Sequence, residues 1–174
     1  DVAIEASLTG HLVLSTLHTN SAAETVTRLL DMGCDSFNFA DAILGVLAQR
    51  LAKRICGRCK EAYHPPRDEY DELVRAYGAN AWASLGLDYG DGFRLYRGRG
   101  CEGCNGTGFR GRIGLHELML NSADMRDLIQ SRARTRELLN LALSEGMTTL
   151  LQDGIEKALR GLTTLRCVRS VALK

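Results

Sequence analysis

Four cysteines constrain this chain more than any other feature of its sequence. Cys56 and Cys59 form one C-x-x-C pair, and Cys101 and Cys104 form a second pair after a gap of 41 residues. Two thiolates separated by two residues on a tight turn reach one metal ion at about 2.3 Å, and a second such turn completes a tetrahedron. The spacing therefore predicts a fold that brings these two distant turns together.

The cysteine pattern predicts a structural Zn²⁺ ion bound by all four thiolates. Nothing in the sequence suggests export, which would favour disulfides. Every ligand position is a cysteine, so no coordination position is left open for catalysis. Two alternatives stay open: a pair of disulfides, or unpaired thiols in the core. Cys34 and Cys167 stand apart from the pairs and are interpreted as small core residues.

The cysteine pairs are flanked by basic residues, namely Lys53, Arg54, Arg58, Lys60, Arg97, Arg99, Arg110 and Arg112. One interpretation is a nucleic-acid patch, but few aromatic residues are interleaved for base stacking. The formal net charge of the whole chain is only +1, so no bulk attraction to nucleic acid is expected. The favoured interpretation is that nearby cations stabilise the negative charge of a zinc ion with four thiolates.

The second cysteine pair also matches a known type of zinc-binding turn. The stretch CEGCNGTG follows the C-x-x-C-x-G-x-G pattern of the DnaJ-type chaperone zinc domain, which strings four such turns together. Only one turn here fits, because CGRCKEAY lacks the glycines. A DnaJ-like domain would predict more than one metal per chain. The match is therefore interpreted as convergent, because glycines after such a turn let the backbone bend tightly around a metal.

A second candidate site lies in GHLVLSTLHTN, residues 10–20. Leu12 to Leu17 reads as a strand buried on both faces, and it ends in His18-Thr-Asn before a helix that the capping box Ser21–Glu24 opens. Ligands of open α/β sheets bind beyond the carboxyl ends of strands, and helix N-termini favour anions. This position suits a phosphate-bearing ligand. A purely structural role for His18, and for His11 at the strand's entrance, remains the alternative.

The remaining pattern predicts a mixed α/β chain. Residues 2–8 and 36–49 read as helices, residues 50–55 as a short strand, and a helix follows the prolines 65–66. FRLYR and GFRGRIGLHELML read as strands. From Ser122 onward the chain reads as successive helices, with Ser122 and Thr164 as N-caps and Gly146 and Gly161 as C-caps.

These motifs, in this order, resemble the secretion ATPase family of bacterial type II secretion and type IV pilus assembly, the GspE/PilB type. The residues that carry the resemblance are TGHLVLSTLHTN, which looks like the family's His box, the four cysteines, GFRGRIGLHELM and EGMTTLLQDGIEKALRG. It covers essentially the whole chain. MRDLIQ, residues 125–130, loosely resembles a helix motif of the retraction relatives, which makes Arg126 a candidate for a coupling role.

The resemblance implies an α/β fold: the C-terminal part of a RecA-like P-loop NTPase domain with a four-cysteine zinc-binding subdomain. The expected division is a core portion at 1–55, the zinc subdomain at 56–105, and a strand with a C-terminal helical region at 106–174. His18 would face the γ-phosphate side, with His11 supporting it. Zinc would be structural, and ATP and Mg²⁺ would serve the full-length protein.

The implied partners are copies of the chain itself in a hexameric ring, and platform proteins of the inner membrane. The implied location is cytoplasmic, peripheral to that membrane through partners, without direct nucleic-acid binding. The family's phosphate loop, Asp box and Walker B segment are absent from this sequence, since the chain starts after their place in the family. We therefore expect no ATP hydrolysis by this chain alone. The alternative function is a non-enzymatic zinc module that binds protein or nucleic acid.

Overall fold

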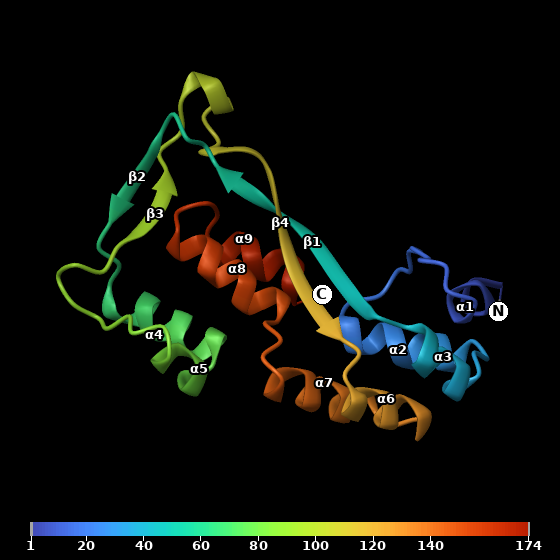
Figure 1. Ribbon diagram of the computed structural model, residues 1–174. Coiled ribbons are helices and arrows are strands. Elements are labelled where there is room, and N and C mark those ends of the chain that lie inside the picture. Colours follow the sequence, from blue (N-terminus) through green and yellow to red (C-terminus); the bar gives the residue numbers. More distant parts are fainter. Residues whose placement is uncertain (1, 174) are drawn as a thin grey trace. The chain divides into compact units, whose positions relative to one another are not determined.

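The computed structural model describes residues 2–173, which divide into two compact units (Figure 1). The first unit contains the residues up to Ala48 together with Glu117–Thr148, and the second contains Gln49–His116 together with the residues from Thr149 on. Each unit is therefore built from two separate stretches of chain. The strands β1 (Gly45–Ile55) and β4 (Phe109–Leu120) carry the chain from one unit to the other.

The first unit is helical around the ends of these two strands. Its helices are α1 (Val2–Leu8), α2 (Ala22–Asp31), α3 (Ser36–Ala42), α6 (Ala123–Gln130) and α7 (Thr135–Ser144). Helix α3 packs on α1 and α6, and α2 packs on α7. The fully buried side chains are apolar ones spaced along helix faces, including Val26, Met125, Ile129 and Leu138.

The second unit joins a small sheet to helices. Strand β2 (Lys60–Tyr63) pairs antiparallel with β3 (Leu95–Gly98), with Lys60 opposite Gly98. Its helices are α4 (Arg67–Tyr77), α5 (Ala79–Ala83), α8 (Leu150–Leu159) and α9 (Leu165–Ala172), with a short 3₁₀ turn, η1 (Glu102–Cys104). Edge-to-face rings of Tyr70 and Trp82, whose centroids lie 5.6 Å apart, anchor its aromatic core.

Strands β1 and β4 form a two-stranded sheet. The N–H of Asn121 donates to Leu44 O at one end, and the N–H of Cys56 donates to Gly108 O at the other, so the strands run antiparallel (Figure 1). Their side chains alternate between buried and exposed positions along much of their length.

The predicted strand at Leu12 to Leu17 is wrong. These residues are irregular in the structure, and the side chains of Leu12 and Leu14 are 77% and 89% exposed. A strand buried on both faces needs a hydrogen-bonded neighbour on each edge and helices above and below. The part of the chain that the structure describes places no strand beside this segment, so its apolar run has nothing to pair with.

The predicted helix at 36–49 is also wrong in its second half. Helix α3 ends at Ala42, and β1 begins at Gly45. The side-chain amide of Asn121 donates to Ala40 O and Ile43 O, which satisfies carbonyls at this helix end. A Cβ at Gly45 would lie 2.9 Å from Met119 O, so the glycine permits the close approach of β4 that turns the apolar run into a strand.

The other predicted elements are confirmed. Helix α1, the helix after the prolines, the strands β3 and β4 and the four helices from Ser122 onward all form. The hydroxyls of Ser21, Ser122 and Thr164 accept backbone N–H groups at the starts of α2, α6 and α9. These caps were predictable because they depend only on local residue type.

Candidate metal centre and histidine segment

The two cysteine pairs lie at the same end of the β2–β3 sheet. Cys56 and Cys59 occupy the turn between β1 and β2, whereas Cys101 precedes the short 3₁₀ turn after β3 and Cys104 is its last residue. Lys60, the first residue of β2, pairs with Gly98, the last residue of β3, so the turn before β2 and the turn after β3 lie at the same end of the antiparallel sheet. In each turn the N–H of the second cysteine donates to the carbonyl of the first, at 3.3 Å and 3.1 Å.

The four sulfur atoms form a compact group, all within 4.8 Å of one another. The Sγ–Sγ distances are 4.0 Å for Cys56–Cys101, 3.8 Å for Cys59–Cys104 and 3.8 Å for Cys101–Cys104. A tetrahedron with metal–sulfur bonds of about 2.3 Å has edges of about 3.8 Å. The spacing of the thiols thus matches a zinc site with four cysteine ligands, and all six cysteines of the chain are free of disulfides.

Hydrogen bonds and burial shift the thiol pKa values in opposite directions. Backbone N–H groups of Cys101 and Gly108 each donate to Cys104 Sγ at 3.2 Å. These backbone donors, the one from Cys101 foremost, lower the pKa of Cys104 to about 6. Burial raises the pKa of Cys59 to about 11. Cys104 is therefore the thiol best prepared to be a thiolate, whereas Cys59 needs a cation beside it.

Metal retention should fall steeply when the pH drops from 7 to 5. Binding requires four thiolates, so protons compete with the metal. The pKa of Cys104 is lowered to about 6, so its thiolate persists above that pH and is lost below it. The pKa of Cys59 is raised, so this thiol takes up a proton still more readily. Zinc released to a chromogenic chelator at stepped pH measures this. An affinity for zinc that does not change between pH 7 and pH 5 would contradict thiolate ligation.

Two pairs of glycines close the backbone around the metal site. A Cβ at Gly98 would lie 2.0 Å from Gly108 O, and a Cβ at Gly100 would lie 2.5 Å from Gly106 O. Gly108 also adopts φ 76°, which favours glycine. The glycines before and after the second cysteine pair thus allow two backbone segments to approach more closely than any side chain would permit. We call residues 56–63 and 95–108, which hold the two turns and the β2–β3 sheet, the metal lobe.

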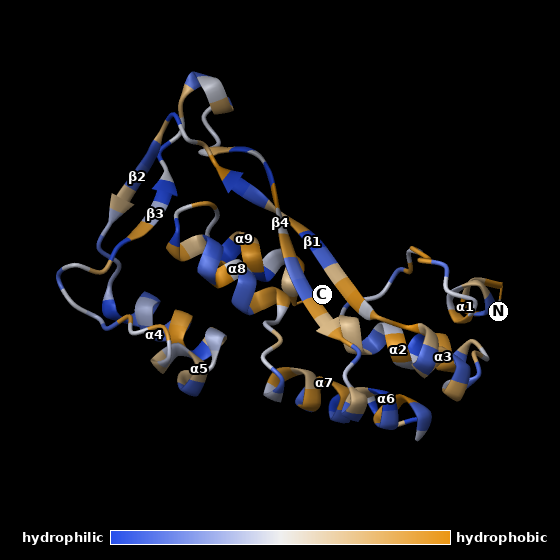
Figure 2. Cartoon of the chain, viewed as in Figure 1, coloured by the Kyte–Doolittle hydropathy of each residue, from blue (hydrophilic) through white to orange (hydrophobic). Residues whose placement is uncertain are grey.

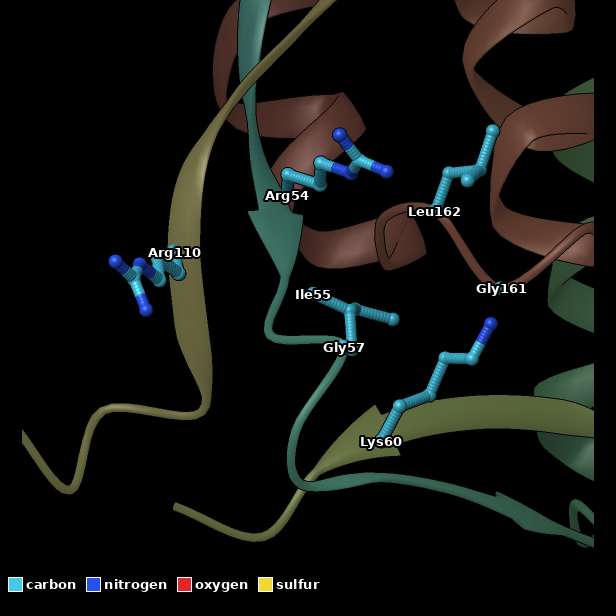
Figure 3. A pocket seen from close by; sticks show the side chains of 7 residues that line it. All are labelled: Arg54, Ile55, Gly57, Lys60, Arg110, Gly161 and Leu162. Carbon is cyan, nitrogen blue, oxygen red and sulfur yellow. The ribbon is translucent and has the colours of Figure 1, made fainter. Parts of the chain in front are cut away.

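Cations gather beside the metal lobe. Hydrophilic residues colour much of β2 and the arrowheads of β3 and β1 blue (Figure 2). A cavity of about 330 Å³ is lined by Arg54, Ile55, Gly57, Lys60, Arg110, Gly161 and Leu162. The Arg54 and Lys60 side chains extend toward the turn after α8, whereas Arg110 points away (Figure 3). Positive charge there complements both the helix C-terminus and a zinc–thiolate group.

The histidine segment lies in the first unit, between α1 and α2. His11 and His18 are both exposed. The Nδ1 atom of His11 lies 3.2 Å from Thr9 Oγ1 and 3.3 Å from Ala6 O, which ties it to the end of α1. Within residues 2–173, the His18 ring makes no hydrogen bond or ion pair. His18 is therefore available to a ligand, while His11 has local partners.

The remaining two histidines and Arg126 have ordinary structural partners. His64 Nδ1 lies 3.1 Å from Phe93 O, and its ring packs against that of Tyr89 at an angle of 36°. The backbone N–H of His116 donates to Asp153. Arg126 Nε lies 3.5 Å from Asp41 Oδ1, in a half-exposed ion pair. The cysteine cluster is the one group of potential metal ligands found among residues 2–173.

Sequence reasoning missed Glu117. This carboxylate is only 4% exposed, and its Oε1 accepts the backbone N–H of Ala22 at 2.8 Å. The sequence did contain an indication of this residue: Glu117 stands between Leu115 and Met119 in the alternating set of positions that is otherwise apolar in β4.

These features define an α/β chain with a four-cysteine site, and solved structures share its fold. The crystal structure of the pilus retraction motor PilT with bound ADP aligns with 99% of this chain and 36% of its own, with a TM-score of 0.59 and 21% sequence identity. At that identity the likeness concerns the fold alone. The likeness shows that this chain has the fold of about a third of the PilT chain.

The chain belongs to the type II/IV secretion system protein family, whose model matches residues 1–170. The type IV pilus assembly ATPase PilB of Thermus thermophilus is 45% identical over 94% of this chain and 17% of its own length. The type II secretion system protein E of Pseudomonas aeruginosa is 42% identical over 98% of this chain and 32% of its own. The chain thus spans a third or less of these relatives. No helix within residues 2–173 is both long and apolar enough to cross a membrane.

Proposed function

We propose that this chain is the C-terminal part of a RecA-like ATPase that powers pseudopilin or pilin assembly, in type II secretion or in type IV pilus biogenesis. The observation that carries the proposal is the family match over residues 1–170. Relatives about 40% identical over nearly the whole chain bear the names of secretion and pilus assembly proteins. In this proposal the complete protein is a cytoplasmic hexamer that docks on inner-membrane platform proteins.

The proposed chemistry is ATP hydrolysis by the complete protein. Phosphoryl transfer needs a phosphate-binding lysine, Mg²⁺ ligands and a residue that positions the attacking water. This chain contains no G-x-x-x-x-G-K-[ST] loop, so ATP and Mg²⁺ would be held by other parts of the protein. The chain would supply His18, which is exposed directly before α2 and senses the γ-phosphate side of the nucleotide. His11 would support the same segment from the end of α1.

The proposed metal is one structural Zn²⁺ per chain. Cys56, Cys59, Cys101 and Cys104 offer four sulfur atoms at tetrahedral spacing and no open position. When bound, the ion supplies a rigid cross-link between two turns that the sequence separates. The negative charge of the thiolates would bind the cation, and the N–H groups of Cys101 and Gly108 would orient Cys104 Sγ toward it.

Replacing His18 with glutamine in the full-length gene product should lower kcat for Mg-ATP about 100-fold, in line with the loss of one preorganised transition-state contact. Because His18 is exposed and makes no internal bond, stability should not change. His11→Gln is the matched control and should cost far less. Steady-state phosphate release and thermal melting measure both. A His18→Gln enzyme with wild-type kcat would remove the proposed role, and a full-length protein without any ATP turnover would remove the proposed function.

A further inference from the structure

Glu117 is a carboxylate in a place where the fold calls for an apolar side chain. Leu115, Glu117 and Met119 alternate along β4 on its buried face, with exposed fractions of 0%, 4% and 2%. Burying a carboxylate costs free energy unless hydrogen bonds or charges compensate it. Core packing alone does not account for this residue.

The carboxylate instead contacts the start of α2. Its Oε1 atom accepts the backbone N–H of Ala22, the first residue of that helix, at 2.8 Å. The first N–H groups of a helix have no partner within it. Ala22 is fully buried, so water does not reach this N–H, and Glu117 takes the place of solvent.

The neighbouring residues are held in the same way. Glu24 Oε2 accepts the N–H of Asn20 at 3.0 Å, and Ser21 Oγ accepts the N–H of Glu24 at 3.2 Å. Thr25 Oγ1 lies 2.6 Å from Thr19 Oγ1. Each residue from 19 to 22 therefore has a defined contact, and the exposed His18 stands immediately before them.

We propose that Glu117 is a positioning residue, which fixes the backbone on the carboxyl side of His18 so that the imidazole is presented to the nucleotide in one geometry. This inference rests on the proposed role of His18. Catalytic groups act only when they are held close to the productive arrangement, and a misplacement of 1 Å costs up to about 100-fold in rate. Glu117 touches no reacting atom in this scheme, and its effect passes through α2.

The test separates turnover from stability in the full-length gene product. Glu117→Met restores the apolar pattern of β4 but cannot accept the Ala22 N–H, whereas Glu117→Gln keeps an acceptor oxygen of the same reach. We expect Glu117→Met to melt below the wild-type temperature, because the buried N–H of Ala22 loses its acceptor, but to remain folded at the assay temperature. In the folded variant we expect a loss of at least about tenfold in kcat and a KM for ATP within about twofold of wild type. Glu117→Gln should retain most of kcat. Glu145→Ala, an exposed residue after α7, is the matched control.

Hydrogen exchange of the peptide covering residues 19–26 gives a second readout, and it should quicken in Glu117→Met but not in Glu117→Gln. Wild-type kcat in a folded Glu117→Met enzyme would overturn the inference. So would a loss of kcat that only follows a loss of folded protein, or a failure of Glu117→Met, Glu117→Leu and Glu117→Ala alike to fold, because Glu117 would then be a folding contact. Full activity of His18→Gln would instead remove the proposed role of His18, and a full-length protein without ATP turnover would remove the proposed function, whatever the Glu117 variants do.

Discussion

Replacing Cys104 with serine is expected to release the metal and to unfold the metal lobe. Cys104 Sγ lies 3.8 Å from two other sulfur atoms and accepts two backbone N–H groups, so its loss removes a ligand and the atom that orders the second turn. Structural zinc contributes about 10–16 kcal/mol of apparent binding free energy in small zinc domains at neutral pH. Elemental analysis should fall from one zinc per chain to essentially none.

The unfolding should stay local. The β2–β3 sheet has only four residues in each strand, and a two-stranded sheet is marginal in water without support. The aromatic core around Trp82 has its own buried contacts. Hydrogen exchange should therefore quicken at 56–63 and 95–108, while Trp82 fluorescence stays close to that of the unmodified chain. Cys34→Ser is the matched control, since Cys34 lies outside the cluster. A Cys104→Ser protein that keeps zinc and an ordered lobe would contradict the assignment.

Replacing Gly98 with alanine should be nearly as damaging, although it changes no ligand. The new Cβ would lie 2.0 Å from Gly108 O. Overpacking typically costs about 1–3 kcal/mol, and we expect at least about 3 kcal/mol here because both partners are backbone and neither can rotate away. Gly108 also donates its N–H to Cys104 Sγ, so the displacement should weaken metal binding.

Gly92→Ala is the matched control for this change. Gly92 lies in the same unit, a Cβ there would meet nothing within 4 Å, and its φ is not in the left-handed region. Thermal melting and competition for zinc with a chelator of known affinity compare the two variants. If Gly98→Ala binds zinc as tightly and melts at the same temperature as Gly92→Ala, the backbone contact does not hold the lobe together.

The cysteine cluster was predictable because its chemistry is local. Two C-x-x-C turns need only short-range geometry, and metal coordination then demands their convergence whatever lies between them. The fold between the turns was only partly predictable. The sequence signals the helix after the prolines and the strand at β3, but pairing of Lys60 with Gly98 depends on the whole stretch that separates them.

The two wrong elements share a physical cause. Residues 12–17 and 43–49 are both short apolar runs, which hydrophobic periodicity cannot assign to helix or strand without tertiary information. The second run became strand because β4 was available to pair with it. The first has no strand beside it within residues 2–173, and its leucines remain exposed. Tertiary partners, and not intrinsic preference, decided both outcomes.

The role of Glu117 lies beyond sequence reasoning for a different reason. Its position in an apolar phase signals something unusual, but its partner, Ala22, is 95 residues away in the chain. Every residue except proline has a backbone N–H, so the type of residue does not show which N–H the carboxylate would bind.

The segment from Cys56 to Gly108 contains the metal lobe and the helices α4 and α5, and its two end residues are joined by a hydrogen bond of 2.9 Å. Because its ends meet, a short turn could replace this segment without breaking β1 or β4, at the cost of the contacts that α4 and β3 make with α8. Such a layout lets β1 and β4 exist with or without the segment that carries the four cysteines. Engineering can exploit the same junction to graft a foreign domain at this point.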